Sequence, residues 1–558
     1  MAFSWLLKSV SPGLSFQDGA ELCHAGALLG IAHPPGFPLW VLVARMSCLL
    51  PLGAWPMRIN LLSAACIGGC SFFLCKLGEN RAGLGQGVAA LAGLCLLWGE
   101  RLWRQGVGCE VYALQIFLMS VCLWLIAGRR KKPRGVSVGL FLGFLLCAHP
   151  PLGVMMTPFL WGVWARRRGR AGSREWPIMA AMAAVAMSCW LLLPIRAGHG
   201  SEVLWSDTSQ WTGLFRHGAR SGYPLENSWA QLGNLWPQLR VAWSDLFQSH
   251  GWFVAAIAVV GLCRSPFGLG ACLLLWTYGA TSLALCFLME GSPERWELMA
   301  NRVFFLPGSL AAALLFGEGT AGMVRWIQDR ASRRIRLVLL LCVPIPLLFH
   351  GVRTSVAARL RPCWAGDDWA GLMRQVSQGQ SRILVATDSS EFMASFQASV
   401  SEGRRRKAIH RHAWGEPFYM DGLDLSSNAR DFFSAGQWFF MGGESGELGL
   451  AWEYDAVDSF PVFARSAHVP IEGPLLGFPP GAMNFRVLWP VPWDSVVPDE
   501  GARSFFGHLY FGRGWERQRR EQIGVVADYA RCLLIEPDHL PCWYAMRAHW
   551  NQDKETGI

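Results

Sequence analysis

Hydrophobic and polar positions are distributed unevenly along this chain. Apolar runs separated by short polar breaks recur up to about residue 350, and an ordinary mixture of polar and apolar residues follows. A helix needs about 20 apolar residues to cross a bilayer, and several of these runs approach that length. We predict membrane helices at about 59–77, 85–98, 111–128, 136–148, 152–165, 177–195, 251–263, 268–289, 302–317 and 337–353.

Basic residues orient these helices in the membrane. Three clusters of arginine and lysine lie between apolar runs, at residues 129–134, 166–174 and 330–336. Short basic loops stay on the cytoplasmic side, and the predicted helices bring all three clusters to one side. The opposite, outer side then holds residues 11–58, 99–110, 196–250 and everything after about 354.

The change in pattern predicts three parts. Residues 1–353 form a membrane domain, 354–500 an extracytoplasmic α/β or mostly α domain, and 501–558 a helical tail. The run Ser381–Asp388 is typical of a buried strand followed by a loop. The tail resembles a tetratricopeptide hairpin whose first helix ends at Glu536-Pro537. One such unit is too short for a solenoid, so we expect either a cap or a docking element for a partner protein.

Two apolar stretches near the start are not counted as complete spans. Met1–Val10 is too short, and it has no charged start or cleavage site of a signal peptide. We expect it to be the outer end of a first helix whose start is missing. Residues 38–52 are predicted to lie in or dip into the interface, because one more crossing would put the first basic cluster outside.

Composition agrees with a membrane protein and excludes other classes. The chain is 52% hydrophobic and 16% charged, whereas soluble proteins carry about a quarter charged residues. The net charge of +10 lies largely in the short basic loops, so nucleic-acid binding is not expected. The 17 cysteines are scattered through apolar stretches without zinc spacing, and we predict no metal site.

Candidate chemistry lies in the outer segment 11–58. Asp18 and Glu21 stand three residues apart, which places them on one side of a helix start or turn, and His33 precedes the rigid Pro34-Pro35-Gly36 turn. Carboxylates beside a membrane interface carry a high desolvation cost, so they are more often functional than incidental. The alternative is that Asp18 only caps the helix beginning near Gly19.

This segment closely resembles the opening of a membrane O-mannosyltransferase-like family of the GT-C glycosyltransferase type, with eukaryotic and bacterial members. The matching motifs are Asp18-Gly-Ala-Glu21, Leu29-Gly-Ile-Ala-His33-Pro34-Pro35-Gly36-Phe-Pro38-Leu39, Arg58-Ile-Asn60-Leu-Leu-Ser63-Ala64, Glu110-Val-Tyr112-Ala-Leu and Leu193-Pro194-Ile-Arg196-Ala. Gly-Ala replaces the family's Ser-Gly between the two acids and keeps their spacing. The resemblance covers most of the membrane half and, weakly, the strand near 383–388.

The resemblance implies an α-helical polytopic fold with about 10 to 11 transmembrane helices and an acidic site on the outer face. It also implies a sugar donor carried on polyprenyl or dolichyl phosphate, with mannose the expected sugar, and a hydroxyl acceptor on protein Ser/Thr or glycan. Asp18 is expected to act as general base, with Glu21 orienting it or the acceptor. No cofactor is expected, because the lipid-linked sugar is a substrate.

A cation must offset the charge of the departing lipid phosphate. Arg58 and Arg196 are the candidates, since both lie at outer ends of spans, although either could instead reach lipid headgroups. His33 contacts phosphate or sugar, or else fixes the Pro-Pro turn, and Glu110 lines the site. The full expected set for substrate and phosphate is His33, Pro34, Pro35, Arg58, Asn60, Glu110, Tyr112 and Arg196.

Other features leave alternatives open. Aromatic and polar residues of the outer loop 199–223 suit sugar stacking or a membrane interface equally well. A transporter or lipid flippase remains a rival, favoured by the His149-Pro150-Pro151 break between two spans. A non-catalytic scaffold is another, and it predicts that both acids are dispensable. The membrane is either a bacterial cell membrane or that of the endoplasmic reticulum.

Overall fold

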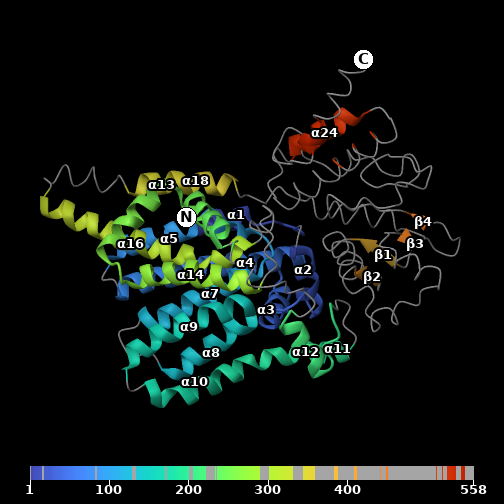
Figure 1. Ribbon diagram of the computed structural model, residues 1–558, viewed down its shortest axis with the longest axis horizontal. Helices are drawn as coiled ribbons and strands as arrows, with labels where there is room; N and C mark the ends of the chain where they lie inside the picture. Colours follow the sequence, from blue (N-terminus) through green and yellow to red (C-terminus); the bar gives the residue numbers. More distant parts are fainter. Residues whose placement is uncertain are drawn as a thin grey trace.

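The structure is a computed structural model of the chain, and it is mainly helical over the part that it describes. It describes residues 2–15, 18–81, 84–128, 134–169, 172–199, 205–220, 233, 235–288, 301–330, 343–357, 383–386, 407–410, 440–441, 448–449, 511, 514, 518, 524–535 and 542–546. The helices α1 to α18 gather into one body, with α10 along one edge and α13 and α18 along the opposite edge (Figure 1).

The helices of this body follow the apolar runs of the sequence. Their bounds are α1 Ala2–Ser9, α2 Asp18–Leu28, α3 Pro38–Cys48, α4 Trp55–Arg81, α5 Gln86–Leu97, α6 Glu100–Val107, α7 Val111–Leu123, η1 Trp124–Gly128, α8 Gly135–Ala148, α9 Pro150–Arg168, α10 Gly172–Met187, η3 Ser188–Leu191, α11 Leu192–Gly198, α12 Trp211–Gly218, α13 Leu235–Arg264, α14 Leu269–Leu288, η5 Asn301–Phe305, α16 Pro307–Arg330 and α18 Pro344–Ala357. Within the described ranges, the predicted membrane runs lie largely on these helices. The run 177–195 is divided among α10, η3 and α11, and the run 302–317 between η5 and α16.

Among the residues that the structure describes, four helices are long and apolar enough to cross a membrane by length and composition. They are Trp55–Asn80, Val111–Gly128, Arg174–Gly198 and Leu235–Arg264. Shorter apolar helices accompany them at Pro38–Cys48, Gln86–Leu97, Gly135–Ala148 and Leu269–Leu285. The multi-pass helical architecture expected from the hydropathy pattern is therefore confirmed.

The long helix α13 differs from the expectation. The sequence predicts a span from residue 251 after an outer loop, whereas helix already begins at Leu235. Gly251 stands inside it with φ 77 and ψ 159, so two helices meet there at a kink. Glycine adopts this backbone conformation with little strain, which explains why the kink is tolerated at this residue.

Glycines allow two helix pairs to approach closely. A Cβ on Gly139 of α8 would lie 2.1 Å from the Met179 carbonyl oxygen of α10. A Cβ on Gly319 of α16 would lie 2.1 Å from the Ile257 carbonyl oxygen of α13. Small residues serve in this way where membrane helices pack through backbone contact.

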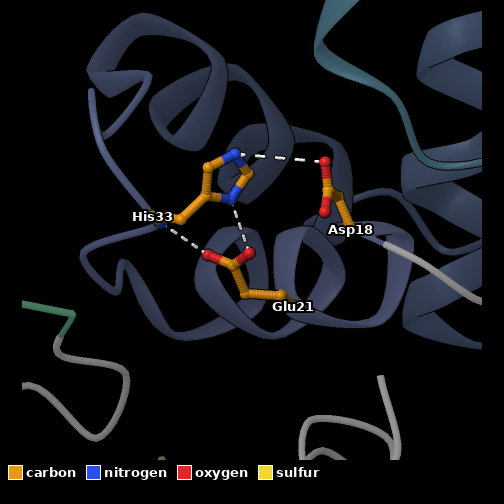
Figure 2. Close-up of side chains that lie close together, drawn as sticks. All are labelled: Asp18, Glu21 and His33. Atoms are coloured by element: carbon orange, nitrogen blue, oxygen red, sulfur yellow. Dashed lines mark hydrogen bonds and ion pairs between the residues drawn. The ribbon is translucent and has the colours of Figure 1, made fainter. Parts of the chain in front are cut away.

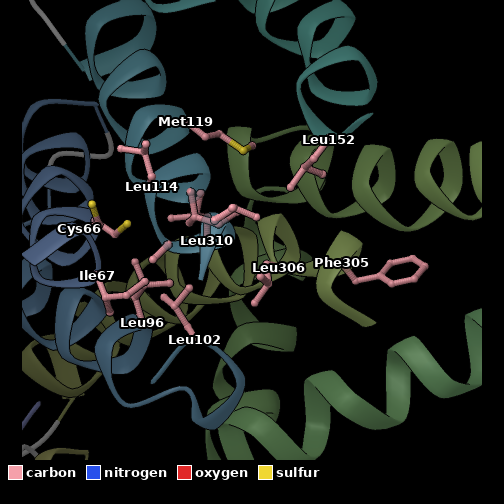
Figure 3. Close-up of a cluster of buried hydrophobic side chains, with 14 of the residues drawn as sticks. Cys66, Ile67, Leu96, Leu102, Leu114, Met119, Leu152, Phe305, Leu306 and Leu310 are labelled. Atoms are coloured by element: carbon pink, nitrogen blue, oxygen red, sulfur yellow. The ribbon is translucent and has the colours of Figure 1, made fainter. Parts of the chain in front are cut away.

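The core of the body is a continuous set of buried apolar side chains. Figure 3 shows part of it, where Ile67 of α4, Leu96 of α5 and Leu114 of α7 meet Leu310 of α16. These residues are distant in sequence and share one buried cluster, so α4, α5 and α7 form a common support with α16. The outer segments α2 and α3 pack on this support.

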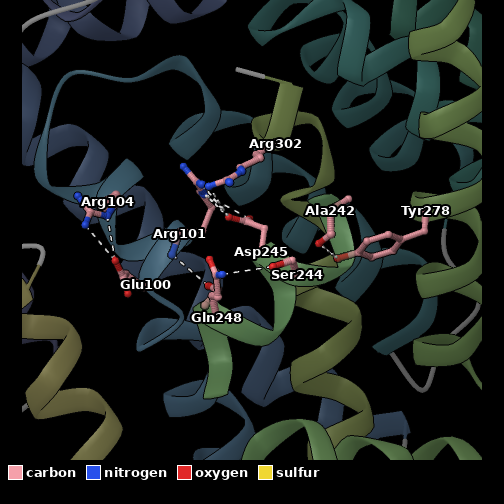
Figure 4. A network of polar contacts seen from close by, with 10 residues as sticks. Glu100, Arg101, Arg104, Ala242, Ser244, Asp245, Gln248, Tyr278 and Arg302 are labelled. Carbon is pink, nitrogen blue, oxygen red and sulfur yellow. Dashed lines mark hydrogen bonds and ion pairs between the residues drawn. The ribbon is translucent and has the colours of Figure 1, made fainter. Parts of the chain in front are cut away.

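A polar network joins α6 to α13 and η5 (Figure 4). Arg101 donates Nη2–H to Asp245 at 2.7 Å, and its Nε contacts both Asp245 oxygens at 3.2 and 3.3 Å. Arg302 adds an ion pair to the same carboxylate at 3.5 Å. Arg101 N also donates to Ser249 Oγ at 3.0 Å. One half-buried carboxylate thus holds two guanidinium groups from separate segments.

The C-terminal part contains a small sheet and a helix. Strands β1 Ile383–Ala386, β2 Lys407–His410, β3 Phe440–Met441 and β4 Leu448–Gly449 are ordered β2-β1-β3-β4. The β1–β2 pair is parallel and the other two pairs are antiparallel. Strand β1 lies where the sequence predicts a strand.

Helix α24, Val525–Ile535, ends immediately before Glu536-Pro537, where the sequence predicts a helix end. Residues 542–546 are helical as well. The tetratricopeptide resemblance of this tail stays a prediction, as do the three-part division of the chain and the outer location of the C-terminal part.

Candidate active site

Two carboxylates and one imidazole meet at the start of α2 (Figure 2). The His33 backbone N–H donates to Glu21 Oε1 at 2.6 Å, and its ring Nδ1 lies 2.6 Å from Glu21 Oε2. The other ring nitrogen, Nε2, lies 4.0 Å from Asp18 Oδ2. The side chain of Glu21 is 3% exposed and that of Asp18 is 61% exposed. The cluster therefore has a buried acid, a bridging histidine and an accessible acid.

The local sequence explains this arrangement. Asp18 and Glu21 are one turn apart in the first turn of α2, so both point to the same side. The helix ends at Leu28, and Leu29 with φ 55 turns the chain back. Gly36 closes the next turn by donating its N–H to the His33 carbonyl at 2.7 Å. The chain thereby reverses direction and places His33 beside Asp18 and Glu21.

Charge and burial oppose each other in this cluster, which lies outside the membrane-spanning helices. Burial raises the pKa of Glu21, although the His33 charge acts in the other direction. Burial alone would lower the pKa of His33, but the charges of Glu21 and Asp18 outweigh it and raise the pKa to about 9. The Glu21–His33 pair therefore retains one proton at neutral pH, with the imidazole as its carrier.

Aromatic rings surround the histidine. Phe37 and Trp205 meet the His33 ring edge to face, at centroid distances of 5.0 and 5.8 Å. Phe37 also stacks on His149 at 5.5 Å with an interplanar angle of 16°. Residues from the turn after α2, the loop before α12 and the break between α8 and α9 thus line one site.

The segment 205–220 packs against the His33–Gly36 turn. His217 of α12 is buried, and its Nδ1 lies 2.5 Å from Ser206 Oγ. A Cβ on Gly36 would lie 2.9 Å from His217 Nε2, so the turn and α12 are in direct contact. The positive charge of Arg220 acts on His33, Tyr112 and His149. Arg220 thus places a cation at the site from a distant part of the sequence.

The two arginines expected at the lipid phosphate donate hydrogen bonds to backbone carbonyls in this structure. Arg58 donates to the carbonyls of Cys48, Leu52 and Gly53 after α3. Arg196 donates through Nε to Leu29 O at 2.8 Å and through Nη2 to Leu28 O at 3.2 Å. Both guanidinium groups therefore stabilise turns of the outer segment, Arg196 at the C-terminal end of α2.

The remaining expected residues take different places. Asn60 is buried and donates Nδ2–H to the carbonyls of Ser11 and Gly13, each at 3.0 Å, which fixes the chain before α2. Glu110 precedes α7 in extended conformation and is half-buried. The ring of Tyr112 lies 4.8 Å from that of His149. Pro34 and Pro35 form the turn after His33, joined by a cis peptide bond.

Sequence reasoning did not assign His149 and Arg220 to the site. A signal for His149 exists in the sequence, because Ala148-His149-Pro150-Pro151 repeats the motif Ala32-His33-Pro34-Pro35. For Arg220 we find no such signal beyond its position in the loop 199–223. Only the packing of α12 against the turn brings it close.

One group of three side chains among the described residues could hold a metal ion. The ligand atoms of Asp18, Glu21 and His33 all lie within 4.8 Å of one another. However, His33 Nδ1 and both Glu21 oxygens are engaged in the mutual hydrogen bonds described above. A metal bound by these three residues would have to displace these contacts.

Comparisons with known proteins agree with the resemblance found in the motifs. Residues 18–172 match the family described as the Protein O-mannosyl-transferase TMEM260 N-terminal domain. The chain is 28% identical to the Protein O-mannosyl-transferase TMEM260 of Mus musculus over 159 residues. That match spans 26% of this chain and 21% of the mouse protein, so only about a fifth of the relative's length is covered.

A solved structure extends the similarity in fold. ArnT from Cupriavidus metallidurans, in a crystal structure bound to undecaprenyl phosphate, matches with a TM-score of 0.51. The match covers 79% of this chain and 94% of that chain at 12% sequence identity. The expected resemblance to an O-mannosyltransferase family is therefore confirmed in sequence over residues 18–172. Over most of its length the chain shares its fold with ArnT.

Proposed function

On the premise that this chain resembles the O-mannosyltransferase-like GT-C proteins, we propose that it is a membrane glycosyltransferase. It transfers a sugar, mannose by family resemblance, from a polyprenyl or dolichyl phosphate to a hydroxyl group outside the cytoplasm. The observation that carries the proposal is the accessible Asp18 carboxylate beside the buried Glu21–His33 pair. The acceptor is a protein Ser/Thr or a glycan.

Asp18 is the general base in this mechanism. Its side chain is 61% exposed, so an acceptor hydroxyl can approach it. The acceptor oxygen forms a bond to the anomeric carbon of the sugar while the bond from that carbon to the phosphate oxygen breaks. The hydroxyl proton passes to Asp18, and the electron pair of the broken bond leaves with the lipid phosphate.

Glu21 and His33 orient Asp18. Glu21 fixes the ring of His33 through Nδ1, and this directs Nε2 toward Asp18 Oδ2 at 4.0 Å. With its pKa raised to about 9, burial notwithstanding, the imidazole is positively charged at neutral pH and attracts the Asp18 carboxylate. Both groups are thus held in place before the substrate arrives, which favours the reaction.

Arg220 is our candidate for the charge of the lipid phosphate. Its charge acts on His33, Tyr112 and His149, and a guanidinium group binds phosphate oxygens with two parallel hydrogen bonds. Arg58 and Arg196 donate to backbone carbonyls in this structure. ArnT bound to undecaprenyl phosphate is a neighbour in fold that contains a ligand of this chemical class.

The test is transfer by the full-length protein reconstituted in lipid bilayers. The substrates are polyprenyl-phosphate sugars, with mannose first, and hydroxyl acceptors in peptides and glycans. We expect Asp18→Asn to lower kcat by about 100-fold or more, because a positioned base contributes roughly 10²- to 10⁴-fold. Asp329→Asn is the matched control, since Asp329 is an exposed acid near the end of α16 and should leave kcat unchanged.

The rival functions predict other outcomes. A flippase would move the lipid-linked sugar across the bilayer without forming a glycosidic product. A scaffold would tolerate Asp18→Asn fully. Unchanged transfer by a folded Asp18→Asn protein would refute the mechanism, and an absence of transfer by the unsubstituted protein from every donor would refute the function.

A further inference from the structure

The motif Ala-His-Pro-Pro occurs twice among the helix breaks of the membrane domain. Ala32–Pro35 forms the turn after α2, and Ala148–Pro151 separates α8 from α9. The structure brings the two together, since Phe37 stacks on the His149 ring and also contacts the His33 ring. His149 therefore belongs to the site spatially, although more than 100 residues separate it from His33.

Three aromatic rings from three separate segments hold His149. Besides Phe37, Tyr112 of α7 lies at 4.8 Å and Phe304 of η5 at 5.6 Å, measured between ring centroids. The residue is 2% exposed. These contacts hold the plane of the His149 ring in one orientation.

A hydrogen bond determines where the His149 ring carries its proton. The backbone N–H of Leu152 donates to Nδ1 at 3.2 Å, which caps the first turn of α9. A nitrogen that accepts a hydrogen bond has no proton of its own, so the neutral ring carries its N–H on Nε2. The cap thus leaves Nε2–H as the donor that His149 offers.

Positive charges act on the His149 ring. They come from Arg220 and His33. Asp18 and Glu110 act on the adjacent Tyr112, so acids and cations meet around the same aromatic group. A neutral N–H donor near a guanidinium group suits an anionic oxygen, because hydrogen bonds to charged acceptors are stronger than those to neutral ones.

We propose that His149 binds the substrate by donating Nε2–H to a phosphate oxygen of the lipid-linked sugar, beside Arg220. This proposal rests on the proposed function and assigns a specific donor to its phosphate subsite. The group that His149 recognises is the phosphoryl oxygen that becomes more negative as the sugar departs. His149 is thus both the cap of α9 and a substrate contact.

One substitution separates these two roles. Asparagine is among the best helix-capping residues, and its side-chain oxygen can replace Nδ1 as acceptor for Leu152 N–H, but it has no group at the position of Nε2. We expect His149→Asn to unfold at nearly the same temperature as the unsubstituted protein. Its KM for the polyprenyl-phosphate sugar should rise on the order of 10- to 100-fold, the effect of losing one hydrogen bond to a charged group.

Undecaprenyl phosphate without a sugar is the probe for the phosphate itself. It should inhibit transfer by the unsubstituted protein, and its inhibition constant should rise in His149→Asn by the same factor as KM. The matched control is His350→Asn on α18, another histidine whose ring contacts a backbone group, with Nε2 at 3.0 Å from Ser249 O. This variant should leave KM and inhibition unchanged.

A second variant covers the case in which asparagine does not preserve the fold. Glutamine extends its amide N–H toward the position of Nε2 but is a poorer cap, so His149→Gln should lose stability and keep KM within a few fold. If KM rises in both variants in proportion to their loss of thermal stability, His149 is only structural and the proposal is wrong. A folded His149→Asn protein with unchanged KM overturns the proposal too, while transfer by the unsubstituted protein would still support the proposed function.

Discussion

His33 contacts both acids of the site, and its own state depends on them. Its backbone N–H and ring Nδ1 occupy the two oxygens of Glu21, and its Nε2 faces Asp18. The side chain is 17% exposed, so these contacts are shielded from water. Single residues of this cluster therefore influence stability and chemistry together.

The His33 proton predicts a pH dependence of stability. Burial lowers the pKa of His33, the two carboxylates raise it more strongly, and the result is about 9 against the ordinary 6.5. The folded protein thus holds a proton that the unfolded chain releases, so the stabilisation is fully present below pH 6.5 and is lost as pH rises through 9. We expect a loss of at most about 3 kcal/mol over this range.

Thermal unfolding between pH 6 and pH 10 measures this effect. His33→Asn removes the titrating group, so its unfolding temperature should depend less on pH over the same range than that of the unsubstituted protein. Identical pH profiles for the two proteins would contradict the charged state assigned to His33.

Gly36 predicts a second effect at the residue scale. Its φ of 95 is unfavourable for other residues, and an added Cβ would lie 2.9 Å from His217 Nε2 and 3.1 Å from Leu193 Cδ1. We expect Gly36→Ala to destabilise the protein by about 1–3 kcal/mol and to reduce transfer, because the turn that holds His33 must shift. Gly87→Ala in α5 is the control, since its added Cβ meets nothing within 4 Å. Equal stability of the two variants would show that the turn tolerates a side chain.

At the scale of elements, the outer helices are held by polar contacts as well as by apolar packing. Asp245 of α13 binds Arg101 of α6 and Arg302 of η5, and η5 also supplies Phe304, which contacts Tyr112 and His149. The network in Figure 4 therefore links α6 and α13, through η5, to the aromatic residues around His149.

Removing the shared carboxylate tests this connection. Asp245→Asn leaves two half-buried guanidinium groups without their anion, so we expect a stability loss of about 3 kcal/mol. Arg101→Met together with Asp245→Asn should lose less than the sum of the single changes, because the two residues interact directly. Additive losses in thermal or denaturant unfolding would mean that the pair contributes nothing.

At the scale of the whole molecule, orientation decides whether the site can work. The basic segments and the acid cluster must face opposite sides of the membrane for a reaction outside the cytoplasm. Gly169 follows the basic end of α9, and Gln210 precedes α12 beside the site. The predicted orientation places these two positions on opposite faces of the membrane.

Epitope tags inserted at these positions measure the orientation in intact cells or vesicles. We expect an antibody to reach a tag after Gln210 from outside and to reach a tag after Gly169 only after permeabilisation. A tag after the C-terminus should behave like the one after Gln210, in line with the extracytoplasmic C-terminal part that the sequence predicts. The reverse pattern at Gln210 and Gly169 would contradict a site outside the cytoplasm.

The sequence alone determined the local features of this protein. Apolar runs specify helices wherever water is excluded, because backbone groups must then be satisfied within the segment. The spacing of Asp18 and Glu21 fixed their common side by helix geometry, and the short run at Ile383–Ala386 specified a strand. Each of these features depends on neighbours a few residues apart.

Only the tertiary structure decided which distant groups share the site. In the fold, Arg58 and Arg196 donate hydrogen bonds to backbone carbonyls. His149 shares Phe37 with His33, and the charge of Arg220 acts on His33. A guanidinium group binds a carbonyl or a phosphate with the same donors, so the choice depends on what the folded chain places within reach. That depends on helix packing between residues far apart in sequence, which no local pattern encodes.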